Sequence, residues 1–460
     1  MRRAYNRGAM PVSPARAAAF DILLRVERES SYASELLHSS AYERLSTADH
    51  GLATELVMGV LRWRSRLDAV IASASSQPLT KLDAEILIAL RLAVYQFGWL
   101  DRVPKSAAVN ESVELVKRAR KRSAATFVNA VLRKLAAAAQ VGVREAGAAA
   151  PDTLARECAH PLWMVERWAR EYGLSAAQQI CKYDQVVPVT TIRLRTLEAE
   201  AQLWTEGITL SPGALLSSSR RVAAGDITKT KALREGQVVI QDEGSQLVAA
   251  LVGMNVPEEG RRILDCCAAP GGKALAIADK NPNSTITAVE LHPHRARLLQ
   301  KLLHPHATRI QIVNADAEHL PVSSKFDRVL ADVPCSGTGT LARNPEIKWR
   351  LTLDDLGQLA QRQLAILRSA LAKVASGGRL IYSTCSLERE ENEDVVEQAL
   401  AENPSFRPFD CRRELELLKA TGDLTWLDVE SLSRGSYLRT IPGVHPCDGF
   451  FAAVLERSLD

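Results

Sequence analysis

Short apolar runs alternate with helical segments from Arg261 onward, and this alternation constrains the fold more than any other feature of the chain. Strands that alternate with helices form a mainly parallel sheet with helices on both faces. A later run, residues 450–455, is expected to add an antiparallel strand. The pattern predicts an α/β, Rossmann-like domain over residues 256–460. The expected parallel strands are residues 263–267, 285–289, 310–313, 326–331 and 379–383.

The first third of the chain has a helical pattern throughout. Apolar residues recur at intervals of three and four between Pro14 and about Ala139, which is the spacing of one buried helix face. Asp83 is expected to cap one of these helices. The Ala/Gly-rich stretch 136–150 is weakly patterned and is expected to link this part to the rest of the chain. We therefore predict an all-α domain over residues 1–145.

The middle region, residues 152–255, mixes short helical segments with strand-like runs. Residues 190–194 and 237–240 are the strand candidates. Arg193 and Arg195 are spaced to lie on one face of the first of these strands. That arrangement fits either contact with RNA or a solvated strand face. The region is predicted to be a small α+β part that precedes the α/β domain.

The charge of the chain is unevenly distributed. Residues 1–145 hold 22 Lys and Arg against 14 Asp and Glu, a balance of +8, whereas residues 146–460 hold 36 against 40, a balance of −4. A basic N-terminal part is typical of a protein that faces a polyanion. A solvated helical surface would explain the same count equally well.

The remaining composition excludes several classes of protein. The chain has eight cysteines, none of them in a C-x-x-C pair, so a structural zinc site is not expected. The basic start is not followed by an apolar signal core, and no apolar run approaches the length of a membrane span. We therefore expect a cytoplasmic protein without a disulfide framework, a metal or a membrane anchor.

Ligands of an open α/β sheet bind at the carboxyl ends of its strands, so the residues that follow each strand matter most. Gly271 and Gly272 follow the first strand and let a ligand approach the backbone closely. Glu290 follows the second strand and is placed for ribose hydroxyls, and Asp316 follows the third and is placed for an adenine amino group. Each feature alone is ordinary. Together, without a P-loop or a G-x-G-x-x-G motif, they outline a pocket for S-adenosylmethionine.

Two cysteines follow the fourth and fifth strands. Cys335 lies in residues 332–339 and Cys385 in residues 383–386. A free cysteine is most often a small buried core residue, and for either cysteine alone that interpretation is favoured. Their placement after neighbouring strands favours a catalytic pair instead.

These stretches resemble three motifs of the RNA 5-methylcytosine methyltransferases. The motifs are residues 265–273, 332–339 and 383–386. Within them, the Pro-Cys and Thr-Cys pair, which ends at Cys335 and Cys385, is specific to that family. The sequence departs from the family at Ala274, where a Thr is usual, and this difference is expected to weaken cofactor binding slightly.

The resemblance continues outside the catalytic domain and covers nearly the whole chain. Residues 127–133 resemble the signature of the NusB-type RNA-binding domain. Residues 241–246 resemble the family's lead-in to its first motif, and residues 448–451 resemble its final strand. The resemblance implies three domains: a NusB-like helical domain over 1–145, a middle α+β region over 152–255, and an S-adenosylmethionine-dependent methyltransferase domain over 256–460.

The family also implies a role for each catalytic residue. Cys385 attacks carbon 6 of the cytosine, and Cys335 aids release of the adduct. Asp332 bonds the ring at nitrogen 3 or at the exocyclic amine, while Lys273 either supports the Cys385 thiolate or positions the loop or Asp332. The implied cofactor-binding residues are Cys267, Ala268, Ala269, Pro270, Gly271, Gly272, Lys273, Glu290, Asp316 and Asp332.

The expected substrate is a cytosine in 16S ribosomal RNA, which must be splayed out or flipped to reach the site. The expected protein is a monomer. The same chemistry on transfer RNA or another RNA, and a non-catalytic RNA-binding factor, are the alternatives. An amino-methyltransferase is disfavoured, because such enzymes use an Asp/Asn-Pro-Pro-aromatic motif where this chain has residues 332–335. The target nucleotide is not predicted.

Overall fold

The computed structural model describes residues 12–29, 31–137, 150–196, 198–253 and 260–459. It divides by packing into two compact units. The first comprises Met1–Val187 together with Leu341–Arg350, and the second comprises Pro188–Thr340 together with Leu351–Asp460. None of the helices in the described ranges has both the length and the apolar character needed to cross a membrane.

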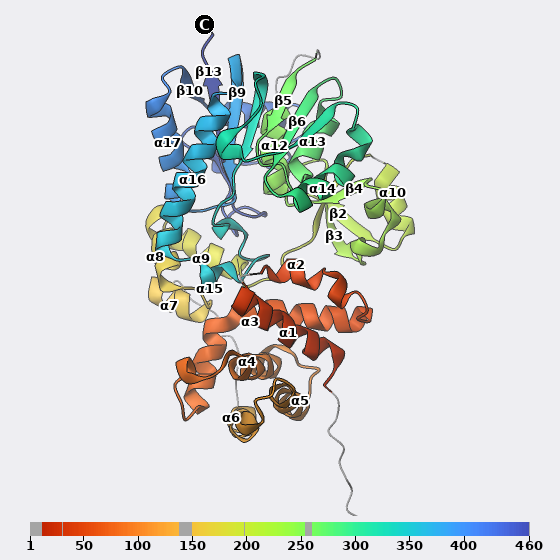
Figure 1. Ribbon diagram of the computed structural model, residues 1–460, viewed down its shortest axis with the longest axis vertical. Coiled ribbons are helices and arrows are strands. Elements are labelled where there is room, and N and C mark those ends of the chain that lie inside the picture. The colour runs from red at the N-terminus through yellow and green to blue at the C-terminus, as the bar shows by residue number, and fades with distance from the viewer. Residues whose placement is uncertain (1–11, 30, 138–149, 197, 254–259, 460) are drawn as a thin grey trace, which may run out of the picture. The chain divides into compact units, whose positions relative to one another are not determined.

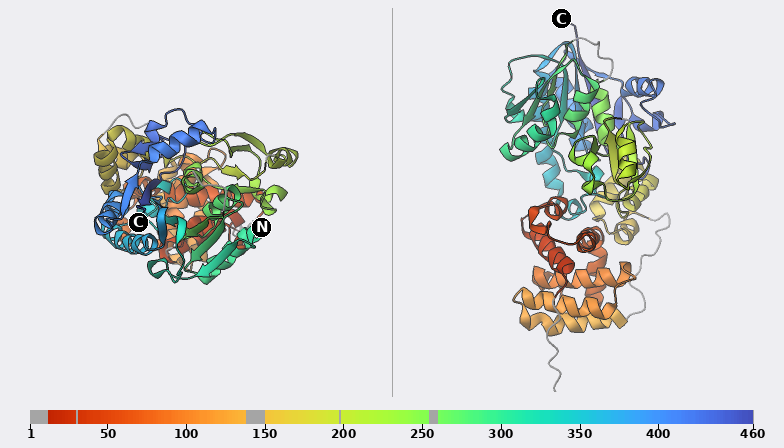
Figure 2. Two further views of the ribbon diagram at one scale, coloured as in Figure 1. Left: turned by 90° about the horizontal axis from the view of Figure 1, so that it is seen from above. Right: turned by 90° about the vertical axis from the view of Figure 1, so that its right-hand side faces the viewer.

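The first unit is entirely helical in its described part, as the sequence predicts. Helix α4 packs against both α3 and α5, and α5 packs against α6 (Figure 2). Asp83 occupies the N-cap position of α4, but its side chain makes no capping hydrogen bond and instead pairs with Lys121 at 2.8 Å. The five longer helices are α1 (Pro14–Glu29), α3 (Thr47–Ala74), α4 (Ala84–Trp99), α5 (Lys105–Arg118) and α6 (Ala125–Ala137).

Three shorter helices also belong to the first unit. The sequence groups their residues with the middle region, but Ala159 of the same stretch joins the core of the long helices, and α7 packs against α3. Most of the predicted linker 136–150 lies outside the described residues. The three predicted domain boundaries stay a prediction. The short helices are α7 (Pro151–Glu157), α8 (Leu162–Tyr172) and α9 (Leu174–Tyr183).

Leu341–Arg350 is far from the other residues of the first unit in sequence, yet it is built into that unit. Its helix α15 (Ile347–Arg350) is anchored by side chains that bond backbone carbonyls. Lys348 Nζ donates to the carbonyls of Arg62 and Ala159 at 2.9 and 3.0 Å, and Trp349 Nε1 donates to that of Leu61 at 2.6 Å. The sequence does not predict this placement.

The second unit contains the predicted α/β sheet. Its strands run in the order β11-β12-β13-β9-β8-β5-β6-β7, with β10 (Phe406–Phe409) paired to β13. The five strands from β9 to β7 are parallel, and β13 runs antiparallel to β9. The predicted parallel sheet and the predicted late antiparallel strand are therefore both confirmed. The strands are β5 (Arg262–Asp265), β6 (Thr285–Glu290), β7 (Ile310–Asn314), β8 (Phe326–Asp332), β9 (Val374–Thr384), β11 (Ser433–Arg434), β12 (Tyr437–Arg439) and β13 (Phe451–Arg457).

Helices cover both faces of this sheet (Figure 1). On β8, Leu330 joins one buried cluster, whereas its neighbours Val329 and Ala331 join the cluster on the opposite face. A strand buried on both faces explains the unbroken apolar runs of the sequence. One face carries α12 (Glu243–Gly253), α13 (Gly272–Lys280), α14 (Pro293–Leu303) and α18 (Cys411–Ala420), and the other carries α16 (Leu353–Leu371) and α17 (Glu393–Glu402).

The second unit also contains a small antiparallel sheet in the order β2-β3-β1-β4. The sequence predicts β1 and β4 and misses the hairpin of β2 and β3. Arg193 lies in β1 and Arg195 directly follows its last residue, and both donate to Asp279 of α13 at 2.7 to 2.9 Å. They form an internal ion pair and not a solvated face. The elements are β1 (Thr191–Leu194), α10 (Glu198–Thr205), β2 (Thr209–Pro212), β3 (Ser219–Ala224), α11 (Lys231–Arg234) and β4 (Val238–Ile240).

Candidate active site

The carboxyl ends of the parallel strands bring the predicted residues to one edge of the sheet. Glu290 and Asp332 are the last residues of β6 and β8. Asp332 lies opposite Ser383 of the neighbouring strand β9. Cys335 and Cys385, 50 residues apart in the chain, therefore follow adjacent strands.

The two cysteines are in direct contact. Their Sγ atoms lie 3.3 Å apart, and both residues are half-buried. The hydrogen bond with Cys385, together with burial, raises the pKa of the Cys335 thiol well above its usual value. Cys335 therefore keeps its proton and can share it with the sulfur of Cys385.

Lys273 and Asp332 form an ion pair beside the cysteines. Their Nζ and Oδ2 atoms lie 2.8 Å apart, and Ser383 Oγ donates to Asp332 Oδ1 at 2.7 Å. Burial opposes the charge of Lys273, but the carboxylate of Asp332 and the nearby Cys385 outweigh it, so the pKa of Lys273 is raised. The ammonium group thus holds Asp332 and places positive charge near Cys385.

Asp265 is a site residue that the sequence analysis did not select. Its carboxyl group is buried at the end of β5; Oδ1 accepts from Cys267 N at 3.3 Å, and Oδ2 has no hydrogen-bond partner among the described residues. Burial, reinforced by Asp332, raises the pKa of Asp265 to about 7. Its position at the end of a strand was the signal that could have identified it.

The glycine loop begins α13. Gly271 has a φ of 111°, and a Cβ there would lie 2.7 Å from Leu302, so no other residue fits without rearrangement. Gly272 opens the helix, whose first turn presents backbone N–H groups. Ala274 is fully buried in the core beneath this loop. The effect of its missing hydroxyl on cofactor binding stays a prediction.

The two acids at the next strands are each oriented by a backbone hydrogen bond. Glu290 Oε1 accepts from His292 N at 2.7 Å, and Asp316 Oδ1 accepts from Glu318 N at 3.0 Å. Each bond engages one carboxylate oxygen. The order along the sheet edge is thus a buried carboxyl group, a glycine loop and two oriented acids.

Glu391 is a second residue that the sequence analysis missed. It is fully buried and accepts from Ser336 N at 2.8 Å, from the hydroxyls of Ser336 and Ser386, and from Gln363 Nε2 at 2.8 Å. It therefore joins the loop of Cys335 to the loop of Cys385. Glu391 lies in a run of acids that is typical of a solvated helix start, so no sequence signal marked it.

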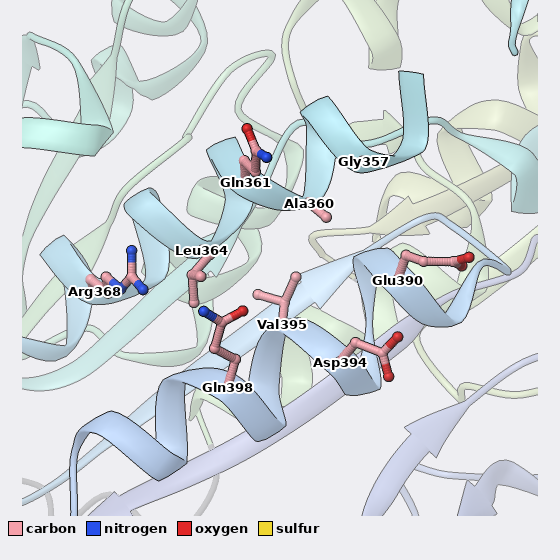
Figure 3. Close-up of a pocket in the computed structure, with 9 residues that line it drawn as sticks. All are labelled: Gly357, Ala360, Gln361, Leu364, Arg368, Glu390, Asp394, Val395 and Gln398. Atoms are coloured by element: carbon pink, nitrogen blue, oxygen red, sulfur yellow. The ribbon is translucent and has the colours of Figure 1, made fainter. Parts of the chain in front are cut away.

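Two cavities lie elsewhere in the second unit. A groove of about 510 Å³ between α16 and α17 is lined by residues such as Ala360 and Val395 (Figure 3). A cavity of about 220 Å³ is lined by Arg193 and Asp279, among others. Neither contains a predicted site residue. In the described ranges, no group of three or more His, Cys, Asp or Glu side chains is placed to hold a metal ion.

Comparisons with known proteins match both parts of the chain. The family model described as 16S rRNA methyltransferase RsmB/F matches residues 253–456, and the NusB family model matches residues 13–137. A probable ribosomal RNA small subunit methyltransferase B of Bacillus subtilis is 33% identical over 97% of this chain and 100% of its own length. Its counterpart in Vibrio cholerae is 30% identical over 96% of this chain and 97% of its own length.

Solved structures share the fold. The crystal structure of PH0851 aligns with a TM-score of 0.77 and 23% identity, and covers 98% of this chain and 100% of that one. NSun6 from Pyrococcus horikoshii, solved with SFG, aligns with a TM-score of 0.54 and 20% identity, over 65% of this chain and 99% of that one. The full-length relatives and the two family models confirm the family resemblance found in the motifs. The chain belongs to the RsmB/F family of 16S rRNA methyltransferases.

Proposed function

We propose that this protein transfers a methyl group from S-adenosylmethionine to carbon 5 of a cytosine in 16S ribosomal RNA, through a covalent adduct with Cys385. The observation that carries the proposal is the contact between Cys335 and Cys385, with 3.3 Å between their sulfurs, beside the Lys273–Asp332 ion pair. Carbon 5 of cytosine is a poor nucleophile. Two thiols next to a cation and a carboxylate supply what its activation and release require.

The residues of the chain divide this chemistry between them. The Cys385 thiolate forms a bond to carbon 6, and the electron pair of the 5,6 double bond makes carbon 5 nucleophilic. Asp332 would bond nitrogen 3 or the exocyclic amine of the ring, and Lys273 offsets negative charge near Cys385. After transfer, the carbon 5 proton passes to Cys335 as Cys335 gives its own proton to the leaving sulfur. The double bond is thereby restored, the sulfur–carbon bond breaks, and both cysteines end as thiols. Cys335, which keeps its proton beside Cys385, is placed to return the leaving thiolate to a thiol.

The sheet edge fits the cofactor. The unpartnered Oδ2 of Asp265 suits a cationic group, the backbone of Gly271 and Gly272 suits a close-fitting ligand, and Glu290 and Asp316 suit an adenosine. When bound, S-adenosylmethionine supplies an electrophilic methyl group on its sulfonium sulfur. The loop residues that would also line it are Cys267, Ala268, Ala269 and Pro270.

Substitution of each cysteine tests the proposal. Cys385→Ala should abolish methyl transfer, whereas Cys335→Ala should accumulate a protein–RNA species that survives denaturation, because the adduct forms but is not released. The matched control is the double variant Cys335→Ala/Cys385→Ala, which should trap nothing. Full activity of Cys385→Ala, or an equal yield of the trapped species from the double variant, would refute the covalent role.

The RNA substrate is tested separately. Methyl transfer to 16S rRNA, to the assembling small subunit and to transfer RNA should be compared with purified protein, followed by mapping of 5-methylcytosine. Names of the full-length relatives favour ribosomal RNA. If only transfer RNA is methylated, the proposed substrate is wrong and the proposed chemistry stands. Absence of both cofactor binding and turnover on every RNA would favour a non-catalytic RNA-binding factor.

A further inference from the structure

The segment that follows Glu290 has an unusual composition. From Leu291 to Ala315 it contains no Asp or Glu, but it holds Arg295, Arg297, Lys301 and Arg309 and four of the nine histidines of the chain. The surrounding unit is acidic on balance, because residues 188–340 and 351–460 hold 29 basic and 34 acidic residues. The segment is therefore a local reversal of charge within the catalytic unit.

Helix α14 displays these charges on one face. Ala296, Leu299 and Leu303 are buried against the sheet. The opposite side is exposed and consists of His294, Arg295, Arg297, Leu298 and Lys301. His294, Arg297 and Lys301 are spaced three and four residues apart, so their side chains project together from successive turns. We call His294, Arg295, Arg297 and Lys301 the α14 basic face.

The cations of this face lack acidic partners. In the described parts of the chain, Arg295, Arg297 and Lys301 form no ion pair, and the contact of Arg297 is to the carbonyl of Pro293 at 3.4 Å. Arginines elsewhere in the unit are mostly neutralised, for example Arg389 by Asp394 and Arg407 by Glu456, each at 2.8 Å. An uncompensated cluster of exposed cations attracts a polyanion.

The position of α14 connects this face to the proposed chemistry. The helix begins at Pro293, three residues after Glu290 ends β6. Its N-terminal end therefore lies at the same edge of the sheet as the strand ends that carry Cys335 and Cys385. Beyond its other end, His306 contacts Arg195, which directly follows strand β1 of the small sheet, at 3.0 Å. A nucleic acid strand with one base in the site has its neighbouring phosphates within reach of such a face.

We propose that the α14 basic face binds the sugar–phosphate backbone of the RNA whose cytosine enters the site; this inference rests on the proposed function. The contacts are to phosphates and not to bases, because the face offers Arg and Lys side chains beside a single apolar residue, Leu298. Its one aromatic ring, that of His294, already lies against the ring of His292, with 5.7 Å between the centroids. Binding there is independent of sequence and weakens as salt rises.

The test is the variant Arg295→Ala/Arg297→Ala/Lys301→Ala. The dissociation constant for a 16S rRNA transcript is measured over a range of salt concentrations, with KM and kcat for methyl transfer. We expect the dissociation constant and KM to rise at least about tenfold at low salt, while kcat at saturating RNA and the affinity for S-adenosylmethionine stay unchanged. Loss of three phosphate contacts should reduce the salt slope by about two.

The matched control removes three arginines from another surface of the same unit: Arg407→Ala/Arg412→Ala/Arg413→Ala. Its change in formal charge is identical, so an equal loss of RNA binding in the control would overturn the proposal, as would an unchanged salt slope in the α14 variant. Binding is measured without turnover. The two proposals can therefore fail separately. If the wild-type protein methylates no RNA but the α14 variant still binds RNA more weakly than the wild type, the proposed function is refuted and the role of this face in RNA binding is supported.

Discussion

The buried carboxyl group of Asp265 illustrates, at the scale of a single residue, a site that favours ligand binding over stability. A buried acid with an oxygen that has no partner is costly when ionised. The fold raises its pKa from the usual 3.8 to about 7 instead of supplying a partner. A cationic group of the cofactor would relieve that cost.

The stability of the protein should therefore depend on pH through Asp265. The folded state keeps this proton up to about pH 7, whereas the unfolded chain loses it near 3.8. Its contribution to stability is thus lost as pH rises from about 4 to 7, and the roughly 3 pKa units correspond to at most about 4 kcal/mol. In Asp265→Asn, the thermal midpoint should fall less than in wild type between pH 5 and pH 8, while S-adenosylmethionine should bind more weakly. If the thermal midpoints of the variant and the wild type fall equally from pH 5 to pH 8, Asp265 is not the source of the pH dependence.

Glu391 carries the second prediction at this scale. Glu391→Gln removes the charge that holds the hydroxyls of Ser336 and Ser386, so the two cysteine loops should lose their alignment. We expect kcat to fall about 10- to 100-fold, since misplaced catalytic groups cost that much, with RNA and cofactor affinity unchanged. The control is Glu397→Gln, whose exposed side chain pairs with Arg389. Similar losses of kcat in both variants would show that alignment is not the role of Glu391.

The residues of the site differ in how far the sequence predicted them. Cys335, Cys385, Asp332 and Lys273 stand directly after strands or in motifs, and strand ends converge in any parallel sheet. The contacts of Glu391 join positions up to 55 residues apart within loops. No periodic pattern encodes such contacts, because they depend on how two loops fold against each other.

At the scale of the element, the sequence predicts the parallel strands but not the segments inserted between them. The parallel strands were predictable, because burial on both faces demands continuous apolar runs. The hairpin of β2 and β3 was not, since its residues are largely exposed or half-buried. Leu341–Arg350 was not predictable either: its short helix is held by Lys348 and Trp349, which bond backbone carbonyls of α3, a helix far away in the sequence.

Lys348 should make the stability of the first unit depend on pH. Burial lowers the pKa of Lys348 to about 7, whereas the unfolded value is 10.5. Between these values the unfolded chain binds a proton that the folded unit does not, so stability should rise with pH over that window. In Lys348→Met this increase of stability with pH should disappear. Thermal unfolding midpoints of the wild type and the variant, measured from pH 7 to pH 10, test this. An identical rise in the variant would exclude Lys348 as its source.

At the scale of the whole molecule, the balance of +8 over residues 1–145 already subtracts the acids, so some cations of the helical part have no acid to pair with. Within the basic run 117–122, Lys117 and Lys121 pair with acids. Arg120 and Arg122 are exposed and form no ion pair in the described ranges. Arg118 also pairs with an acid, Asp21, so the cations of this surface that remain available to RNA within the run are Arg120 and Arg122. Deletion of residues 1–140 is not a clean test of its role, because it would also uncover the buried side of Leu341–Arg350.

Substitution of the free arginines tests the role of the helical unit without that damage. If one RNA molecule contacts both units, Arg120→Ala/Arg122→Ala should weaken binding of a 16S rRNA transcript and reduce the salt slope by about one to two, at about 0.7 to 0.9 per phosphate contact. Combined with the α14 substitutions, the losses in log affinity and in slope should add, because substitutions that share no interaction partner usually act independently. A combined variant no weaker than the α14 variant alone would place the RNA-binding surface in the catalytic unit, and the basic run would then be a solvated helix surface.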